Sequence, residues 1–324
     1  MPKLGLKGKL ALAGLAAVAL VVIGGLFFPV PQPGVELPAN YGGQTPTGES
    51  LEPFYKLGPI YITNTFIAAW LSIIVLVVFF FFATRKMKLV PRGLQNLAEA
   101  VIETLMNFVE GVAGKENGRR FFPIVATIFL FVLMNAWLGL LPFFNVIGRA
   151  EYGTSQTLFF GQYSGPIVYV PLFRGANTDI NVPLMLALVS FTCVEYWGVT
   201  SLGVRRYLGN FLRFGQFFQG LGQLVRGKVK AALGSIFYGA VDIFVGALET
   251  LSEFVRIISF TFRLFGNMTA GEILLLVIAF LVPWVLAVPF YGLETFLGFV
   301  QALIFAALTL VFATAAVSSH ESEH

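Results

Sequence analysis

Apolar runs long enough to cross a lipid bilayer recur along this sequence and leave little chain between them. The run at residues 61–83, YITNTFIAAWLSIIVLVVFFFFA, carries no charged side chain. A helix needs about 20 predominantly apolar residues to span roughly 30 Å of hydrocarbon. With 57% hydrophobic and only 12% charged residues, the chain also has too few polar side chains to cover a water-soluble globule. We therefore expect an all-α integral membrane protein.

Six such runs predict about six transmembrane passes. Three lysines precede the first run, which fits either a signal peptide or a retained membrane anchor over residues 1–30. The length of the run, and the lack of an A-x-A cleavage site after it, favour the anchor. Residues 31–58 are rich in Pro, Gly, Asn and Thr and are expected to form an outer-side linker, followed by a membrane domain over 59–324. The expected passes are 10–29, 61–83, 121–142, 181–203, 234–282 and 291–317.

Basic residues cluster where the chain should return to the cytoplasm. Four of them lie between Arg85 and Arg92, directly after the second run, and six more lie between Arg205 and Lys230, after the fourth. The positive-inside rule places both clusters on the cytoplasmic side. A Gly- and Tyr-rich loop at about 145–178 then lies outside, and both termini are predicted to be cytoplasmic in a multi-pass protein of the inner (plasma) membrane.

Residues 91–112 show a different pattern from the apolar runs. Apolar side chains recur there at intervals of three and four residues, and acidic side chains take other positions, which predicts an amphipathic helix along the inner interface. The apolar positions are Leu94, Leu97, Val101, Leu105 and Phe108, and the acidic ones are Glu99, Glu103 and Glu110. Within the third run, Asn135 is expected to make a helix-packing hydrogen bond.

The segment 234–282 is too long for an upright helix. At 1.5 Å per residue it would extend roughly 70 Å, more than twice the hydrocarbon thickness. It must either break near Gly266 or lie steeply inclined, and we favour the inclined helix. Pro283 and Pro289 are expected to bracket a reversal into the last helix, which gives a long inclined two-helix hairpin at the C-terminal end.

These last two segments contain ionisable and amide side chains at membrane depth, where each charge costs at least a few kcal/mol. At about 100° per residue, Ser259, Arg263 and Asn267 share one stripe of the helix. Glu272 points about 180° away from Arg263, which excludes a direct pair between them on one helix. The full set is Asp242, Glu249, Glu253, Arg256, Ser259, Arg263, Asn267 and Glu272 in the long segment, and Glu294 and Gln301 in the last helix.

The chemistry of these groups favours a proton pathway. Arginine stays protonated at any accessible pH, so Arg263 cannot relay a proton but can serve as a fixed electrostatic gate for a mobile carboxylate. Glu272 and Glu294 are carboxyl groups that can exchange protons from an aqueous half-channel. The alternative is that these groups form buried ion pairs that only orient the helices. Their number in two adjacent helices favours the transport of protons or another small cation.

Other chemistries find little support in the sequence. Cys193 is the single cysteine, so one chain has no intramolecular disulfide and no cysteine metal site. His320 and His324 lie in a polar tail, where a metal site is not expected. No GxxxxGK[ST] run is present, so the chain is not expected to be an ATP-hydrolysing enzyme on its own. We expect no cofactor, no metal and no nucleic-acid partner.

The run SFTFRLFGNMTAGEILL at residues 259–275 resembles the signature of the a subunit (subunit 6) of F-type ATP synthases, around that family's essential arginine. QALIF at 301–305 is similar to the family's final helix, and weaker similarity extends through 90–103, 121–142 and 177–191. The resemblance implies that Arg263 faces a ring of c subunits, with Gln301 opposite it. It also implies b subunits of a peripheral stalk, and the rest of the synthase, as partners.

The resemblance further implies a role for each remaining polar residue. Asn267, Glu272 and Glu294 would line the half-channel open to the outer side, and Glu249, with Glu253, Asp242 or Ser259, would serve the cytoplasmic one. The chain departs from some relatives at Glu294, where they carry His, and in its N-terminal pass and the basic insert at 205–230.

Two other classes of function compete with this reading. A secondary transporter would show paired repeats with interrupted helices, and the sequence shows no such symmetry. A purely structural subunit would tolerate Arg263→Ala except for a loss of assembly.

Overall fold

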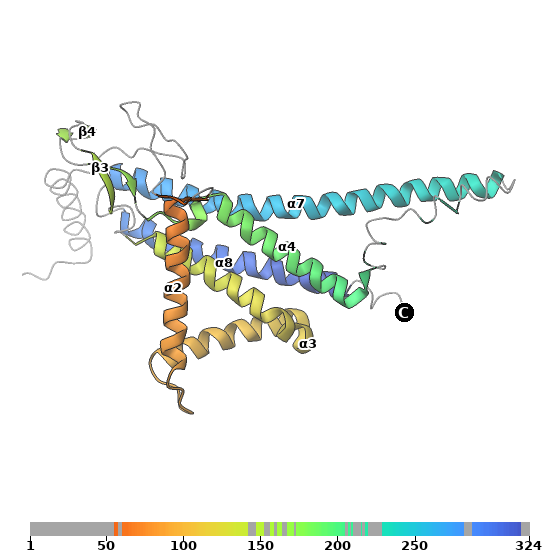
Figure 1. The fold of residues 1–324 in the computed structure, drawn as a ribbon, viewed down its shortest axis with the longest axis horizontal. Helices are drawn as coiled ribbons and strands as arrows, with labels where there is room; N and C mark the ends of the chain where they lie inside the picture. Colours follow the sequence, from red (N-terminus) through yellow and green to blue (C-terminus); the bar gives the residue numbers. More distant parts are fainter. Residues whose placement is uncertain are drawn as a thin grey trace, which may run out of the picture. The chain divides into compact units, whose positions relative to one another are not determined.

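In the described residues of the computed structural model, five helices are long and apolar enough to cross a membrane, which confirms the all-α membrane architecture (Figure 1). They are α2 (Asn64–Thr84), α3 (Leu94–Gly139), α4 (Asn181–Leu202), α7 (Val229–Leu281) and α8 (Ala287–Ser318). The structure describes residues 55–57, 60–141, 147–151, 156–158, 161–163, 167–171, 173–204, 207, 209, 215, 218–219, 229–281 and 287–318. The expected anchor at 1–30, nearly all of the linker, most of the basic insert and both histidines lie outside these residues.

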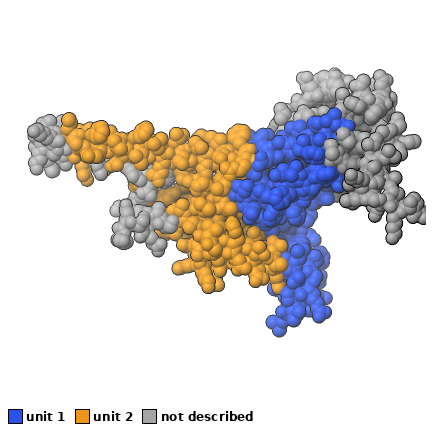
Figure 2. All heavy atoms as spheres, turned by 180° about the vertical axis from the view of Figure 1, so that it is seen from behind, with its two compact units in different colours: residues 1–98, 129–182, 264–304 blue, residues 99–128, 183–263, 305–324 orange. Residues whose placement is uncertain are grey.

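The chain divides into two compact units, each made of three separate stretches (Figure 2). The first unit comprises residues 1–98, 129–182 and 264–304, and the second comprises 99–128, 183–263 and 305–324. Each long helix except α2 contributes to both units, and each unit is described below by itself.

Helix α2 begins at a side-chain cap and joins the first unit through polar contacts. The Thr63 hydroxyl accepts a hydrogen bond from the Phe66 amide, which satisfies one of the free N–H groups of the first turn. One residue into the helix, the buried Thr65 hydroxyl donates to the Asp179 carboxylate at 2.8 Å. These contacts fix the start of α2 against the segment that precedes α4.

A buried hydrogen bond links α2 to α3 in the middle of the apolar helices. The Ser72 hydroxyl donates to Asn135 Oδ1 at 2.8 Å, and Asn135 Nδ2 donates to the Phe131 carbonyl one turn back. Ser72 and Asn135 are 1% and 2% exposed, so neither group reaches water at the surface. The helix-packing role expected for Asn135 is confirmed.

Helix α3 is two helices that meet at Gly114. Its φ of 77° and ψ of 168° are not helical, and glycine adopts a positive φ without the steric penalty of a Cβ. The first part buries Leu105, Val109 and Ala113 at successive fours, and the second part contains the third expected pass. The helix predicted at residues 91–112 is therefore present and ends at this kink.

The loop expected at about 145–178 contains short strands that the sequence analysis did not predict. In the described part of this loop, β3 (Gly148–Glu151) pairs with β6 (Ile167–Pro171), and β4 (Gln156–Leu158) pairs with β5 (Gly161–Tyr163), both antiparallel. A third antiparallel pair, β1 (Tyr55–Leu57) with β2 (Ile60–Ile62), lies before α2. A 3₁₀ turn, η1 (Ala176–Thr178), then leads towards α4. The β-branched and aromatic residues of IVYVP, at 167–171, are the local signal for the longest of these strands.

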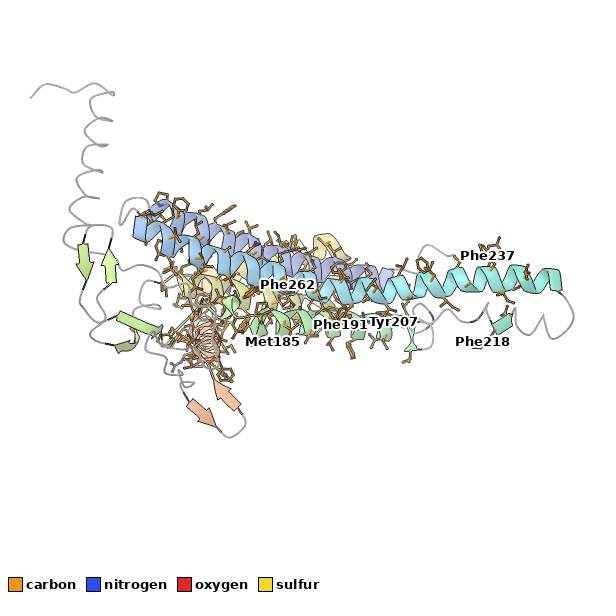
Figure 3. All side chains as sticks on the ribbon, turned by 90° about the horizontal axis from the view of Figure 1, so that it is seen from above. Met185, Phe191, Tyr207, Phe218, Phe237 and Phe262 are labelled. Atoms are coloured by element: carbon orange, nitrogen blue, oxygen red, sulfur yellow. The ribbon has the colours of Figure 1, made fainter. Side chains whose placement is uncertain are left out.

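Helix α7 runs for 53 residues without a break, which at 1.5 Å per residue is roughly 80 Å. It continues through Gly266, so the broken alternative is wrong and the helix is longer than an upright pass allows. Large apolar side chains of the second unit follow α7 at alternate intervals of four and three residues, and all are exposed (Figure 3). This exposed apolar row comprises Phe237, Val241, Phe244, Leu248, Leu251, Val255, Ile258 and Phe262.

The last helix starts earlier than expected. Because α8 begins at Ala287, Pro289 lies in its first turn, where the missing N–H breaks no helical hydrogen bond. The reversal therefore ends before Pro289, which corrects the expectation that the two prolines bracket it. Within the second unit, α8 packs on α7 through Phe260, whose ring centroid lies 5.0 Å from Phe305 and 5.8 Å from Phe312.

Replacing Ser72 by Ala should weaken the packing of α2 on α3. The variant loses the donor to Asn135, and interhelical hydrogen bonds of this kind contribute about 0.6 kcal/mol on average in membranes. Unfolding of the purified chain in mixed micelles with rising SDS would measure the loss. Thr84→Ala is the control, because the exposed Thr84 hydroxyl bonds only to the Phe80 carbonyl of its own helix. Equal losses in the two variants would contradict the role given to Ser72.

Candidate functional site

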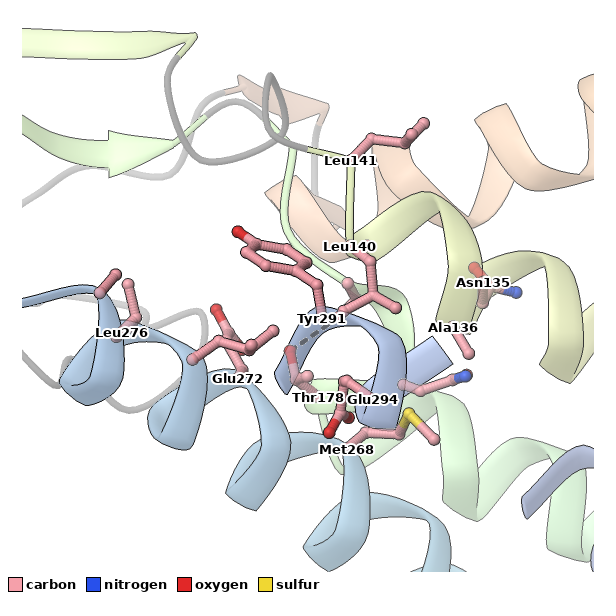
Figure 4. Close-up of a pocket in the computed structure, with 15 residues that line it drawn as sticks. Asn135, Ala136, Leu140, Leu141, Thr178, Met268, Glu272, Leu276, Tyr291 and Glu294 are labelled. Atoms are coloured by element: carbon pink, nitrogen blue, oxygen red, sulfur yellow. Dashed lines mark hydrogen bonds between the residues drawn. The ribbon is translucent and has the colours of Figure 1, made fainter. Parts of the chain in front are cut away.

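A cavity of about 230 Å³ in the first unit is lined in part by polar side chains (Figure 4). Residues from α3, the turn at η1, α7 and α8 line it, so it depends on the tertiary fold. Its polar lining consists of Asn135, Asn177, Thr178, Glu272, Tyr291 and Glu294, and most of the rest is apolar. A polar cavity of this size has room for water.

Arg174 holds Glu272 at this cavity. Its Nε lies 3.3 Å from Glu272 Oε1, and both Nε and Nη2 donate to Oε2 at 3.3 Å. The two side chains are 12% and 18% exposed, so the ion pair is largely shielded from solvent. A planar guanidinium can engage both oxygens of a carboxylate, which fixes its orientation as well as its position.

The turn at η1 brings Arg174 to this place. Asn177 Nδ2 donates to the Val132 carbonyl of α3 at 3.2 Å, and the Thr178 hydroxyl donates to the Gly175 carbonyl at 2.7 Å. A Cβ at Gly139 would lie 3.1 Å from the Gly175 Cα, so these two glycines allow the turn to approach the end of α3 closely. The other amide atom of Asn177, Oδ1, is buried without a partner in the described part of the chain.

Glu294 lies directly against the backbone of α7. A Cβ built at Gly271 would overlap its carboxylate, so only glycine at this position leaves space for that group. Glu294 is 5% exposed, and among the described residues no side chain forms a hydrogen bond or ion pair with it. The cavity therefore joins Glu272, which is ion-paired, with Glu294, which has no cationic partner in the described ranges. Both carboxyl groups are labelled in Figure 4.

Asn267 and Gln301 form a second polar contact between α7 and α8 in the first unit. Asn267 Nδ2 donates to Gln301 Oε1 at 2.8 Å. Gln301 is 2% exposed, and its Nε2 has no partner within the described ranges. An unpartnered buried amide is costly, so Nε2 is a donor available to water or to another chain.

In the second unit, charged side chains of α7 follow one line along the helix. Asp242, Glu249, Arg256 and Arg263 are spaced by seven residues, and each step of seven turns the direction by only about 20°. Along the axis, this line extends about 30 Å from Asp242 to Arg263, which matches the thickness of the hydrocarbon core. All four side chains are half-buried in the chain alone.

Arg263 has a weak polar contact and no acidic partner among the described residues. Its Nη2 lies 3.4 Å from Ser259 Oγ, one turn earlier on the same helix. A hydroxyl at this distance does not neutralise a guanidinium, which needs a carboxylate or solvent when it lies at membrane depth. The Arg263 charge is therefore available to a group outside this chain.

Arg256, by contrast, is fully engaged. It forms two contacts with Glu253, at 2.6 Å from Nη1 to Oε2 and 2.7 Å from Nη2 to Oε1. Its guanidinium also lies over the Phe312 ring of α8, 3.7 Å from the centroid, which is a cation–π contact. Glu253 thus takes part in the kind of buried ion pair that orders helices.

A further acidic group of the second unit was missed from the sequence. The Tyr207 hydroxyl donates to Glu195 Oε2 on α4, and Gly198 leaves space for the Tyr207 ring. Burial raises the pKa of Tyr207 above its ordinary range, and the hydrogen bond to Glu195 adds to this. Glu195 is the only charged residue of the fourth apolar run, and that isolation is the signal that could have identified it.

The structure thus divides the predicted polar residues into two groups. Glu272 and Glu294 share the cavity, and Asn267 contacts Gln301 beside it, all in the first unit. Asp242, Glu249, Glu253, Ser259 and Arg263 belong to the second unit. The sequence analysis also missed Arg174 and Tyr291, which come to the cavity from a loop and from the first turns of α8. In the described part of the chain, no cluster of His, Cys, Asp and Glu side chains could hold a metal ion.

Comparison with known proteins gives one consistent family. The family model described as ATP synthase A chain matches residues 66–314, which include both the cavity and Arg263. The chain is 32% identical over 232 residues to ATP synthase subunit a of Campylobacter jejuni subsp. doylei, covering 71% of this chain and 79% of that protein. It is 31% identical over 255 residues to the same subunit of Campylobacter concisus, covering 78% and 88% of the two chains.

A relative from Helicobacter acinonychis, also an ATP synthase subunit a, is 28% identical over 268 residues, which is 83% of this chain and 95% of that one. The matched length and identity are large enough to establish the relationship. The chain therefore belongs to the ATP synthase A chain family, the proton-channel subunits of the F0 membrane sector.

Proposed function

We propose that this chain conducts protons through two half-channels that are separated by Arg263, which faces the carboxylates of a rotating c-subunit ring. A proton enters through one half-channel, binds a ring carboxylate, and leaves through the other half-channel after the ring has turned. Net transport therefore requires rotation. The free energy available is about 2.3 kcal/mol per charge for every 100 mV of membrane potential, plus the pH term. Catalysis of ATP synthesis then belongs to partner subunits.

The observation that carries this proposal is the unpaired guanidinium of Arg263. Within the described residues, Ser259 is its only polar contact, at 3.4 Å. A charge at membrane depth without a partner costs at least a few kcal/mol, so a carboxylate of another chain is the expected partner. Since arginine does not release its proton, it can attract a passing carboxylate without conducting protons itself.

The exposed apolar row on α7 supports a helical partner beside this arginine. Its alternating spacing of four and three residues is the pattern by which one helix packs against another in a seam. Phe262 is 56% exposed and directly precedes Arg263 in the chain. Such a row fits the outer helices of a c-subunit ring and gives Arg263 access to their carboxylates.

The cavity supports the half-channel open to the outer side. Glu272 and Glu294 provide carboxyl oxygens there, and Tyr291, Asn177 and Thr178 provide hydrogen-bonding groups for water. Asn267 and Gln301 lie on the same two helices, α7 and α8. We assign Asn267, Glu272, Glu294 and Gln301 to this half-channel.

The second half-channel uses the charged line of α7 in the second unit. Glu249 is its central carboxyl group, with Asp242 towards the start of the helix and Glu253 and Ser259 nearer to Arg263. These positions occupy a different length of α7 from Glu272, which keeps the two water paths apart. The basic clusters place this half-channel on the cytoplasmic side, with both termini in the cytoplasm and the protein in the inner (plasma) membrane.

The proposed partners follow from the same assignment. The c-subunit ring supplies the mobile carboxylates, and b subunits of the peripheral stalk hold the chain still while the ring turns. Membership of the family makes the chain part of an F-type ATP synthase complex. The proposal needs no metal or organic cofactor in this subunit.

Arg263→Ala should abolish ATP-driven proton pumping while the complex still assembles. Loss of one preorganised charge typically costs about a hundredfold or more in rate. Quenching of a pH-sensitive dye in membrane vesicles measures pumping, and quantification of the subunits in the purified complex checks assembly. Arg119→Ala is the control, because the Arg119 side chain is 76% exposed. Near-normal pumping in Arg263→Ala would refute the gate and favour a purely structural subunit.

Gly271→Ala should slow pumping by displacing the Glu294 carboxylate from its place against α7. The added methyl group would overlap that carboxylate, whereas Gly292→Ala, on α8, meets no atom within 4 Å and is the control. Initial pumping rates in vesicles with equal amounts of assembled complex give the comparison. We expect at least about a tenfold loss for Gly271→Ala, since an altered proton-transfer geometry costs at least that much. Equal rates in the two variants would remove Glu294 from the pathway.

A further inference from the structure

The pair formed by Glu195 and Tyr207 has no role in the function proposed above. Tyr207 is 9% exposed, and its hydroxyl donates to Oε2 of Glu195. Nearby on α4, the buried Trp197 packs on Phe121 of α3 with ring centroids 4.5 Å apart. A carboxyl group in such surroundings is costly unless it is neutralised or serves transport.

The two oxygens of Glu195 differ in their surroundings. Oε2 accepts the hydrogen bond from Tyr207, and Oε1 is buried without a hydrogen-bond partner in the part of the chain that the structure describes. A buried acceptor without a partner is destabilising. Oε1 is therefore the oxygen that can bind a proton from water while Oε2 keeps the hydrogen bond from Tyr207.

Electrostatics couples this pair to α7. The pKa of Tyr207 is raised by burial, by Glu195 and by the negative charge of Glu253, and Arg256 partly offsets these effects. A small cavity is also lined by Val194 of α4, which precedes Glu195, and by Arg256 of α7, the partner of Glu253. The carboxyl groups of α4 and α7 therefore lie close enough for the charge on one to affect the others.

Glu253 has less freedom to exchange protons than Glu195. Both of its carboxylate oxygens contact the Arg256 guanidinium, at 2.6 and 2.7 Å. This ion pair compensates the charge of Glu253, although its Oε2, like Glu195 Oε1, accepts no hydrogen bond among the described residues. Glu195 has one oxygen that no group in the described residues occupies.

We propose that Glu195 is a further proton-exchanging carboxyl group of the half-channel assigned above to Glu249, and that Tyr207 is its positioning residue. In this step a proton from water binds Glu195 Oε1, and the neutral acid then passes it to Glu249 or to water beside it, which regenerates the carboxylate. Tyr207 keeps its own proton throughout and holds Oε2 in place. This inference rests on the proposed function, because it extends one of its half-channels.

Glu195→Gln removes the proton-exchanging carboxyl group but keeps a hydrogen-bond acceptor for Tyr207. The amide oxygen can still accept the hydrogen bond from Tyr207, but the side chain cannot carry a proton. We expect the initial rate of ATP-driven pumping by the intact complex in vesicles to fall roughly tenfold to a hundredfold, as when a proton-transferring group is lost. Ser190→Ala is the matched control on α4, since it removes the buried hydrogen bond to Thr309, at 2.8 Å, without a titratable group. Glu195→Asp, which keeps a carboxyl group, should recover part of the rate.

Tyr207→Phe tests the positioning role, because the ring still fits beside Gly198 but the donor is lost. It should slow pumping in the wild-type background and have no further effect in Glu195→Gln. Additive effects of the two substitutions would overturn the positioning role. Normal pumping in Glu195→Gln would overturn the inference as a whole.

Parallel measurement of Glu249→Gln distinguishes the inference from the function on which it rests. Slow pumping in Glu249→Gln with normal pumping in Glu195→Gln would refute only the role of Glu195. Normal pumping in both would refute the assignment of this half-channel. Slow pumping in both, with Ser190→Ala unaffected, would support the inference.

Discussion

The cost of a charge in hydrocarbon is the constraint on which the rest of this structure depends. Arg174 and Glu272 meet it as an ion pair, and so do Arg256 and Glu253. Arg263 has no acidic partner among the described residues, and Glu294 has no cation. In the proposed function, Arg263 and Glu294 are the uncompensated groups that interact with a partner chain or with water, whereas Glu272 and Glu253 line the half-channels as ion-paired groups.

The described helices, and the positions of the polar residues along them, could be predicted from the sequence. Long apolar runs predicted the passes of the described helices to within a few residues, whereas the expected pass at 10–29 lies outside the described residues. The favoured alternative, a helix that continues through Gly266, is confirmed by α7. Loop residues could not be placed in this way. Arg174 reaches Glu272 because Asn177 and a pair of glycines allow the turn to pack against α3. No local sequence pattern predicts such a long-range contact.

The contacts between neighbouring helices could not be predicted from the sequence either. The close approach of Glu294 to Gly271 depends on how α8 packs against α7, which spacing along one helix cannot specify. The sequence analysis places the reversal before α8 too late, because it includes Pro289 in the reversal. In the first turn of a helix, proline breaks no helical hydrogen bond, so Pro289 lies within α8.

The place of Glu294 also determines the side from which it can be reached. Its carboxylate lies against the α7 backbone at Gly271, so that side is closed by main-chain atoms. The cavity lined by Tyr291 and Thr178 lies on its open side. Among the described residues, the cavity is therefore the side from which water can reach this carboxyl group. Within the proposed function, Glu294 exchanges protons with water on the cavity side and not across α7 at Gly271.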